Sequence, residues 1–285
     1  MSFSKEIIVL YHAECMDGFS AAWAAWKKFG NMAEYIPVYY GKASPEWLIG
    51  KEIYTLDFSY PEDVAGKLMS VNKRLTAIDH HAGSEKATRM TQEALFDNNH
   101  SGAFLAWQYF HPDQAPPKFL LNVEDSDLFK FLLPDTTALV AYAGIFLGDF
   151  EKWDQIVADI ENDPKKKEYI DKGNLLLDYQ KSIFQNLMAQ KQKVRFGDQE
   201  AYMVNGPRMF RSEVGHDLAE LTQGMGIYWY QEKDRIHVSL RSVPNFDVSE
   251  VARKFGGNGH KNAASFYFDA DKPFPWKIVR EKENE

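Results

Sequence analysis

Residues 7–29 read IIVLYHAECMDGFSAAWAAWKKF, and this stretch sets the fold expected for the first half of the chain. Its apolar run Ile7–Tyr11 has the length and composition of a buried strand. The segment Ser20–Phe29 is rich in Ala and Trp, which favours a helix packed closely on a sheet. A polar turn over His12–Gly18 joins the two. A strand, a polar turn and a helix in this order are typical of a βαβ unit.

The same alternation continues outward from this stretch over the first 110 residues. Further strands are expected at Tyr35–Tyr40, Ile53–Phe58, Leu75–Ile78 and Ala94–Phe96, and helices near Pro61–Ser70 and Ser101–Phe110. Short apolar strands that alternate with amphipathic helices predict an α/β fold with a doubly wound, mostly parallel sheet.

The remainder of the chain has two different patterns. After Pro112, Pro116 and Pro117 the period is helical through about Gln192. From Val194 alternating segments return, with strands expected at Glu200–Val204, Gly226–Gln231, Arg235–Arg241 and Ala264–Phe268, and helices at Ser212–Leu221 and Val248–Phe255. We therefore expect an α/β domain over 1–150, a helical connector over 151–193 and a smaller C-terminal α/β domain over 194–285. The tail Lys277–Glu285 is expected to be a frayed end.

Composition excludes several classes of protein. The 285 residues carry 33 Lys+Arg against 41 Asp+Glu, a net charge of −8, and 45% are hydrophobic, which is ordinary for a globular chain. Cys15 is the only cysteine, which excludes an intrachain disulfide and a zinc site built on several cysteines. No apolar run approaches the roughly 20 residues that span a bilayer, and no secretory signal pattern is present, so we expect a cytoplasmic protein that is not in a membrane. The acidic balance disfavours long duplex DNA as a partner.

Acidic and histidine side chains recur where the predicted strands end. His12 and Asp17 follow the first strand, Asp57 follows the third, Asp79-His80-His81 follows the fourth, and Val123-Glu-Asp125-Ser-Asp127-Leu-Phe129 comes later. In an open α/β sheet, ligands bind beyond the carboxyl ends of the strands. Carboxylate and imidazole groups together suit Mn²⁺, Mg²⁺ or Zn²⁺, and clustered acids repel one another unless a cation neutralises them. A metal site is the simplest explanation.

Structural roles could also explain most of these residues singly. Asp17 or Asp57 alone is typical of a helix N-cap, His12 of a buried core histidine, and the acids near Asp125 of a solvated helix end. Asp79-His80-His81 is harder to assign to packing, because a polar run that closes an apolar strand has no packing purpose. The histidines without such neighbours are expected to be surface or packing residues: His100, His111, His216 and His237.

At this point the sequence resembles the DHH phosphoesterases in their two-domain form with a DHH-associated C-terminal domain. Asp79-His80-His81 is similar to the motif that names the family, and Tyr11-His-Ala-Glu-Cys-Met-Asp17-Gly-Phe-Ser-Ala-Ala22 to its first motif. Leu56-Asp57-Phe58 and Val123–Phe129 resemble the second and fourth motifs. Gly256-Gly-Asn-Gly-His260-Lys-Asn-Ala-Ala-Ser265 resembles the C-terminal signature GGGGHxxAAG. The resemblance covers nearly the whole chain.

The resemblance implies a hydrolase that cleaves phosphodiester bonds of short oligonucleotides or small dinucleotides with two Mn²⁺ or Mg²⁺ ions. Asp57 would bridge the ions, with His12 at the first and Asp17, His80 and Asp125 at the second. Asp79 would orient His80, and His81 would face the substrate phosphate. Asp57, Asp79, His80 and His81 would then form the catalytic set. Coordination to the metal would activate the attacking hydroxide.

The C-terminal signature implies a substrate site on the smaller domain. Gly256, Gly257 and Gly259 would let backbone N–H groups approach an anion, while His260 and Lys261 would add donors and charge. Arg241 is the matching basic residue. For the glycines alone, a turn before an edge strand is the competing explanation.

Two departures from the family pattern leave alternatives open. Cys15 stands where the first motif usually has an aspartate, and Glu14 is the nearest acid. Cys15 could bind as a thiolate, Glu14 could reach in, or the first metal could be weak or absent. In the last motif Asn258 and Ser265 replace glycines.

We therefore weigh a metal-dependent phosphodiesterase against a nucleotide-binding module with a degenerate first metal site and little turnover. A pyrophosphatase-like enzyme is disfavoured, because a basic triad for a small anion is not evident in the sequence.

Overall fold

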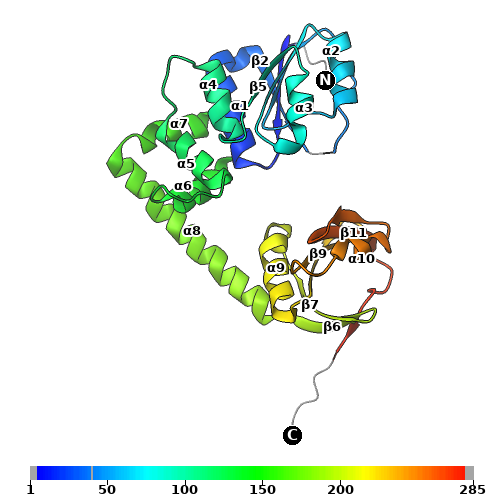
Figure 1. The fold of residues 1–285 in the computed structure, drawn as a ribbon. Helices are drawn as coiled ribbons and strands as arrows, with labels where there is room; N and C mark the ends of the chain where they lie inside the picture. The colour runs from blue at the N-terminus through cyan, green and yellow to red at the C-terminus, as the bar shows by residue number, and fades with distance from the viewer. Residues whose placement is uncertain (1–4, 40, 280–285) are drawn as a thin grey trace. The chain divides into compact units, whose positions relative to one another are not determined.

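The chain forms two compact units, Met1–Leu177 and Asp178–Glu285, in a computed structural model that describes residues 5–39 and 41–279 (Figure 1). The division falls within helix α8 (Asp163–Ala189), so residues 151–193, predicted as a connector, are shared between the two units. None of the described helices is both long and apolar enough to cross a bilayer.

The N-terminal unit is built on a parallel sheet of five strands in the order β2-β1-β3-β4-β5. The strands are β1 (Ile7–His12), β2 (Ala33–Val38), β3 (Glu52–Leu56), β4 (Arg74–Asp79) and β5 (Glu93–Phe96). The predicted doubly wound, mostly parallel sheet is confirmed. The second predicted strand was extended to Tyr40, a residue that lies outside the described part of the chain. The winding reverses between β1 and β3, and such a switch point leaves a crevice at the carboxyl ends of the strands.

Helices cover both faces of this sheet. The helices of this unit are α1 (Met16–Phe29), α2 (Glu62–Val71), α3 (Glu85–Arg89), α4 (Gly102–Phe110), α5 (Lys118–Asp127), α6 (Thr136–Ala143) and α7 (Phe150–Ile160). Of these, α5 and α7 pack against α1, and α6 packs against α5. Alternate residues of β1 face opposite ways: Ile8 and Leu10 pack with residues of α2, while Val9 and Tyr11 pack in the cluster that includes α1 and α4. A buried strand with both faces covered explains why Ile7–Tyr11 is continuously apolar.

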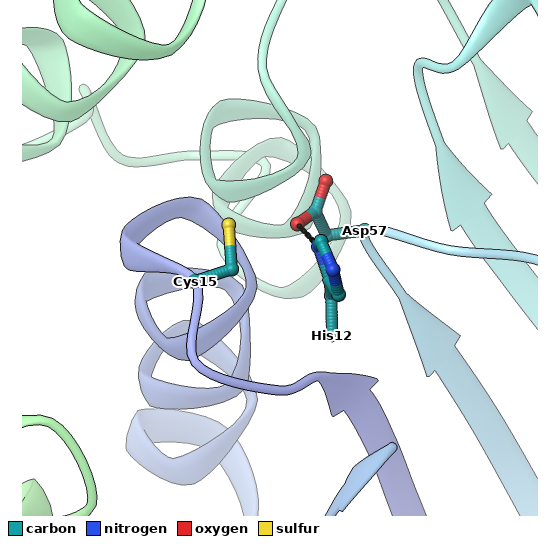
Figure 2. A group of neighbouring side chains, drawn as sticks. All are labelled: His12, Cys15 and Asp57. Carbon is teal, nitrogen blue, oxygen red and sulfur yellow. Dashed lines mark hydrogen bonds and ion pairs between the residues drawn. The ribbon is translucent and has the colours of Figure 1, made fainter. Parts of the chain in front are cut away.

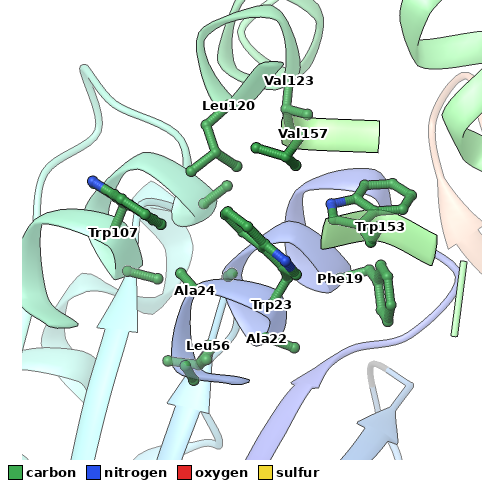
Figure 3. Close-up of a cluster of buried hydrophobic side chains, with 14 of the residues drawn as sticks. Phe19, Ala22, Trp23, Ala24, Leu56, Trp107, Leu120, Val123, Trp153 and Val157 are labelled. Atoms are coloured by element: carbon green, nitrogen blue, oxygen red, sulfur yellow. The ribbon is translucent and has the colours of Figure 1, made fainter. Parts of the chain in front are cut away.

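The larger core cluster holds α1, the helix that begins just after Cys15, in place (Figure 3). Trp23 of α1 stacks on Trp107 of α4 at 5.4 Å between ring centroids, and Phe19 meets Trp153 of α7 edge-on at 4.9 Å. The alanines of α1 are completely buried, as the close packing predicted from the sequence requires. Truncating a buried tryptophan such as Trp23 to alanine costs about 3–5 kcal/mol, so this packing fixes the start of α1 firmly.

The C-terminal unit is built on a mixed sheet in the order β10-β11-β9-β8-β7-β6-β12. Its strands are β6 (Gln192–Phe196), β7 (Gln199–Asn205), β8 (Met225–Glu232), β9 (Arg235–Ser242), β10 (Asn258–His260), β11 (Ala263–Asp269) and β12 (Lys277–Ile278). Helix α9 (Arg211–Thr222) packs on one face and α10 (Val248–Arg253) on the other. The expectation of a frayed tail is wrong for Lys277–Ile278, which pair with β6; residues 280–285 of that tail lie outside the described part.

Short 3₁₀ turns complete the two units, at Gly30–Met32, Ala82–Ser84, Gly144–Phe146 and Arg208–Phe210.

Candidate metal centre

The carboxyl ends of three neighbouring parallel strands bring the expected ligands together. His12 ends β1, Asp57 follows β3, and His80 and His81 follow β4. Asp57 has left-handed backbone angles (φ 61°), which turn the chain out of the strand immediately after Leu56. A non-glycine residue in this region is uncommon and occurs often at functional positions.

One group of ligand atoms consists of His12, Cys15 and Asp57, whose ligand atoms lie within 4.8 Å of one another (Figure 2). The imidazole Nδ1 of His12 lies 3.1 Å from Asp57 Oδ2. Cys15 directly precedes α1, so its thiol comes from the turn between β1 and α1. The structure thus places Cys15 beside both predicted ligands of the first metal.

A second group surrounds His80. Its Nε2 lies 3.2 Å from Asp57 Oδ1 and 3.7 Å from Asp17 Oδ2. The same nitrogen is 3.5 Å from Asp127 Oδ2. Asp57 therefore contributes one carboxylate oxygen to each group, the arrangement expected of a residue that bridges two cations.

The N-terminus of α4 fixes the Asp17 carboxylate. The backbone N–H groups of Gly102 and Ala103 donate to its two oxygens at 2.6 and 2.9 Å. Gly102 approaches so closely that a Cβ atom there would lie 2.8 Å from Asp17 Oδ2 and from Asp57 Cβ. Glycine at this position is required by the approach of the helix to both carboxylates.

Burial and neighbouring charges shift the pKa values of the three clustered acids, Asp17, Asp57 and Asp127, in different directions. Burial opposes ionisation of Asp57, but the neighbouring imidazoles of His12 and His80 outweigh it and lower its pKa to about 2. Burial and the negative charge of Asp57 raise the pKa of Asp17 well above its usual range, and the same causes raise the pKa of Asp127. The cluster therefore cannot hold three carboxylate charges without a compensating cation.

Two buried atoms support a cation at this place. His80 Nε2 and Asp127 Oδ2 are buried and form no hydrogen bond within the described residues. Unsatisfied buried polar atoms are costly, and a metal ligand role accounts for both. Burial, followed by the charge of Asp57, raises the pKa of the Cys15 thiol, so Cys15 would lose its proton only to a bound metal. The donor set of imidazoles and carboxylates fits Mn²⁺, Mg²⁺ or Zn²⁺.

Asp125 lies elsewhere than the sequence predicted. Its carboxylate accepts hydrogen bonds from Leu132 N at 2.7 Å, Leu133 N at 3.1 Å and Thr136 Oγ1 at 2.7 Å. Asp125 thus fixes the loop before α6, and Asp127 reaches the cluster instead. Two residues are about 200° apart around a helix, so only one of these two acids on α5 can face the metal groups.

Asp79 also has a different contact from the one predicted. Its Oδ1 accepts from the backbone N–H groups of His80 and His81, and lies 2.8 Å from His81 Nδ1. Ser84 donates to its Oδ2 at 2.7 Å. Burial opposes ionisation of Asp79, but these contacts lower its pKa, while the bond to Asp79 raises the pKa of His81. Asp79 therefore orients the ring of His81 and not that of His80.

Glu14 and Glu124 are engaged away from the cluster. Tyr39 donates to Glu14 Oε1 at 3.0 Å on the surface. Glu124 accepts from Ser101 N at 3.1 Å and lies 3.1 Å from His100 Nδ1, so His100 has an acidic neighbour that the sequence did not suggest. Neither glutamate belongs to the groups of clustered ligand atoms found among the described residues.

The C-terminal unit has a hollow of about 270 Å³ where the substrate site was expected, but with a different lining. Arg241 and Gly259 line it, whereas Gly256, Gly257, His260 and Lys261 do not. A Cβ at Gly257 would lie 2.1 Å from Ser265 O, and at Gly259 2.4 Å from Ala264 Cα. These two glycines therefore allow β10 to lie tightly against β11.

Several residues of this hollow were missed in the sequence: Arg208, Arg211, Tyr230, His237 and Tyr267. The expectation that His237 is a surface or packing residue agrees with its packing, because its side chain is 7% exposed and its ring stacks on Tyr230, but the same side chain also lines the hollow. The alternation of His237, Ser239 and Arg241 with apolar residues could have indicated one polar face of the strand.

No protein-family model matches the chain. An uncharacterized protein, R106 of Acanthamoeba polyphaga mimivirus, is 28% identical, over 93% of this chain and 68% of that protein.

Three solved structures align over most of the chain. A pGpG-specific phosphodiesterase, PggH from Vibrio cholerae, is 15% identical with a TM-score of 0.52, covering 94% of each chain. RecJ from Thermus thermophilus in complex with Mn²⁺ is 13% identical with a TM-score of 0.52, covering 92% of this chain and 49% of that one. The DHH domain of PF0399, a member of the s1p family of ribosomal proteins, is 11% identical with a TM-score of 0.53, covering 96% and 83%. The chain thus has the fold of the DHH-domain proteins, as the Asp79-His80-His81 motif predicted.

Proposed function

We propose that this chain is a metal-dependent phosphoesterase of the DHH type that hydrolyses phosphodiester bonds in short oligonucleotides or small dinucleotides. One observation carries the proposal: His80 and Asp127 converge on the buried Asp17 and Asp57 in a cluster whose charges need a cation. The likeness to a pGpG phosphodiesterase and to a Mn²⁺-bound RecJ supports it. A cytoplasmic location stays a prediction.

We assign the ligands of two cations, Mn²⁺ or Mg²⁺, from the two groups of donor atoms. His12, Asp57 and Cys15 would hold one ion. Asp17, His80 and Asp127 would hold the other together with Asp57, whose Oδ1 lies 3.2 Å from His80 Nε2, so the role expected for Asp125 passes to Asp127. A bound divalent ion supplies Lewis acidity and lowers the pKa of water, which phosphoryl hydrolysis near neutral pH requires.

The protein groups around these ligands would position the substrate. His81 is 41% exposed at the cluster, and its Nδ1 is held by Asp79. Because the bond to Asp79 raises the pKa of His81, the ring is favoured as a cation that can donate to a phosphate oxygen. Asp79 is accordingly a positioning residue for His81.

We propose that the C-terminal unit binds the remainder of the substrate. Arg241 and Gly259 line its hollow, and the exposed His260 and Lys261 lie on and beside the adjoining edge strand β10. Gly256 and Gly257 shape the chain before that strand. With a net charge of −8 and basic groups gathered locally, short substrates should be preferred to long strands.

Hydrolysis assays test the proposal. The full chain would be assayed on pGpG, linear di- to pentanucleotides, a nucleoside 3′,5′-bisphosphate and pyrophosphate, each with Mn²⁺, Mg²⁺, Zn²⁺ or chelator. We expect hydrolysis of a short nucleotide that needs a divalent ion and is lost in Asp57→Asn. Asp113→Asn, which alters an exposed aspartate of the same unit, is the matched control and should keep full activity.

Two results would contradict this function. Hydrolysis that persists in Asp57→Asn or in chelator would remove the metal cluster from the reaction. Tight binding of short nucleotides without turnover under any metal would instead favour the nucleotide-binding module, for which the cysteine at position 15 is the motivating observation.

A further inference from the structure

The loop between α5 and α6, residues 128–135, carries large apolar side chains on the surface. Phe129 is 84% exposed and Leu132 is 81% exposed, and Phe131 and Leu133 are also exposed. The rings of Phe129 and Phe131 meet edge-on, with their centroids 5.5 Å apart. Single exposed apolar residues are common, but four of five consecutive residues form a patch, which is typical of a contact surface.

The loop that bears this patch is held in one conformation. Asp125 anchors it, because its carboxylate accepts from Leu132 N at 2.7 Å and its carbonyl oxygen accepts from Lys130 N at 2.9 Å. At the start of the loop, Phe129 N donates to Ser126 O at 3.1 Å. The exposed rings are therefore presented to solvent by a preorganised turn and not by a loose segment.

Two residues of the loop have backbone angles that are unfavourable for them. Phe129 has φ 54° and Phe131 has φ 47°, both in the left-handed region. Glycine, asparagine and aspartate adopt this region more easily than a bulky residue does. Strain of this kind clusters at ligand-binding and catalytic sites. A use for the two rings explains why phenylalanine stands at both positions.

The patch begins at the candidate metal centre. Asp127, the last residue of α5, has its Oδ2 atom 3.5 Å from His80 Nε2 in the cluster. Phe129 follows two residues later, so its Cα atom lies at most about 7.6 Å from that of Asp127. A nucleoside spans a comparable distance from its phosphorus atom to the ring of its base. A phosphodiester held at the cluster would therefore have a base within reach of Phe129.

The charge next to the rings favours a nucleotide as the group that covers the patch. Lys130 is exposed and stands between the two phenylalanines in the sequence. Surfaces that bind single-stranded nucleic acid combine aromatic rings, on which bases stack, with basic side chains that face the backbone phosphates. A lipid surface is a poorer match, because binding to anionic lipids needs several basic residues and residues 128–135 contain one.

We infer that Phe129 and Phe131 form a platform on which one base of the substrate stacks, with Lys130 close to the substrate backbone. The inference deepens the proposed function and rests on it for the identity of the substrate. Because the platform touches the base and not the reacting bond, it should strengthen binding without changing the chemical step. The chain should accordingly prefer phosphodiesters that carry a base at this position over those that lack one.

A double-mutant cycle between the platform and the base tests this inference. Calorimetry would measure binding of the full chain to diadenylate and to two analogues that lack the 5′ or the 3′ base, with Ca²⁺ in place of Mn²⁺ to slow turnover. Removing the stacked base from the ligand, or the ring in Phe129→Asn, should each weaken binding about tenfold. Removing both should cost no more than removing one, because the two changes delete the same contact.

Substitutions at position 129 and one control separate stacking from other effects. Asparagine tolerates left-handed backbone angles, so Phe129→Asn should not unfold the loop. Phe129→Tyr keeps an aromatic face and should bind as the unmodified chain does, whereas Phe129→Leu keeps only apolar bulk and should behave like Phe129→Asn. Ile49→Ala, which alters a 65% exposed residue before β3 at the opposite end of the strands, is the matched control and should change nothing.

Hydrolysis provides an independent measurement. In Phe129→Asn, KM for diadenylate should rise about tenfold with kcat unchanged, while neither constant should change for the analogue without the stacked base. A chain that binds dinucleotides through the platform but hydrolyses none would refute the proposed function and leave the inference standing. Hydrolysis with an unchanged KM in Phe129→Asn would overturn the inference and leave the proposed function standing.

Four binding results would overturn the inference: no binding of diadenylate, equal binding of diadenylate and both analogues, additive losses in the cycle, or full affinity in Phe129→Leu. Sedimentation of the full chain and of Phe129→Asn tests a second copy as the occupant of the patch. If Phe129→Asn dissociates an oligomer while its affinity for diadenylate is unchanged, the patch is an interface between copies of the chain and not a nucleotide platform.

Discussion

Replacing Gly102 by alanine should damage the proposed metal centre without replacing any of its ligands. The added Cβ would lie 2.8 Å from Asp17 Oδ2, 2.8 Å from Asp57 Cβ and 2.9 Å from Asp57 Oδ1. Ordinary contact begins near 3.4 Å, so both carboxylates would have to retreat by roughly 0.6 Å. Metal sites tolerate ligand displacements of only about 0.2 Å. We therefore expect Mn²⁺ affinity to fall at least about tenfold, with a loss of stability of about 1–3 kcal/mol from overpacking.

The assay is a Mn²⁺ titration followed by calorimetry, with hydrolysis measured on the same samples. Gly66→Ala is the matched control, because a Cβ at that position of α2 meets nothing within 4 Å. Alanine is also the better helix former, so Gly66→Ala should bind Mn²⁺ normally and gain about 0.5–1 kcal/mol of stability. Equal Mn²⁺ affinity in the two variants would refute the reasoning, since it would mean that the carboxylates of Asp17 and Asp57 do not need their present positions.

Three further predictions concern residues whose roles the geometry separates. Asp127→Asn should weaken Mn²⁺ binding about 10–100-fold and leave the free energy of unfolding nearly unchanged. Asp125→Asn should bind Mn²⁺ normally but lose about 1–3 kcal/mol of stability, because Asp125 anchors the loop before α6. The reverse pattern in Mn²⁺ titration and urea unfolding would contradict the assignment. Cys15→Asp should raise the preference for Mn²⁺ over Zn²⁺ by about tenfold if the thiolate is a ligand, and an unchanged ratio would assign Cys15 to packing. The pKa of His237 is lower in the folded chain than the usual 6.5, so the unfolded chain binds the proton first and stability is lost as the pH falls below 6.5. Urea unfolding at pH 7.5 and pH 5 should show a loss of about 2 kcal/mol at the lower pH, and this loss should be absent in His237→Gln. An equal loss in both chains would disprove a neutral buried His237.

Local sequence was sufficient for the parallel sheet and for most of the side chains that cluster at its carboxyl edge. Buried parallel strands are continuously apolar, so Ile7–Tyr11 and its counterparts stand out in the sequence. Because parallel strands end at one edge of a sheet, the residues that follow them must meet. The sequence therefore predicts that His12, Asp57 and His80 lie together.

The tertiary structure decided which of several neighbouring polar residues takes each role. Asp125 and Asp127 have the same chemistry, and only the rotation of α5 against the sheet turns Asp127 to His80 and Asp125 to the loop before α6. In the same way Asp79 could have oriented either histidine, and the turn after β4 brings it to His81.

Most of the lining of the hollow in the C-terminal unit was decided by tertiary structure, although the sequence had pointed to Arg241 and Gly259. Its residues come from Arg208 to Tyr267, and no local pattern brings them together. Strand register sets Tyr230, His237 and Tyr267 in one row, the turn before α9 adds Arg208, and the first residue of α9 adds Arg211. The sequence by itself determined which polar residues follow each strand, because these residues are adjacent to the strand along the chain. Pairing between distant strands determined where the positive charge gathers, because a site assembled across a sheet depends on register, which adjacent residues do not contain.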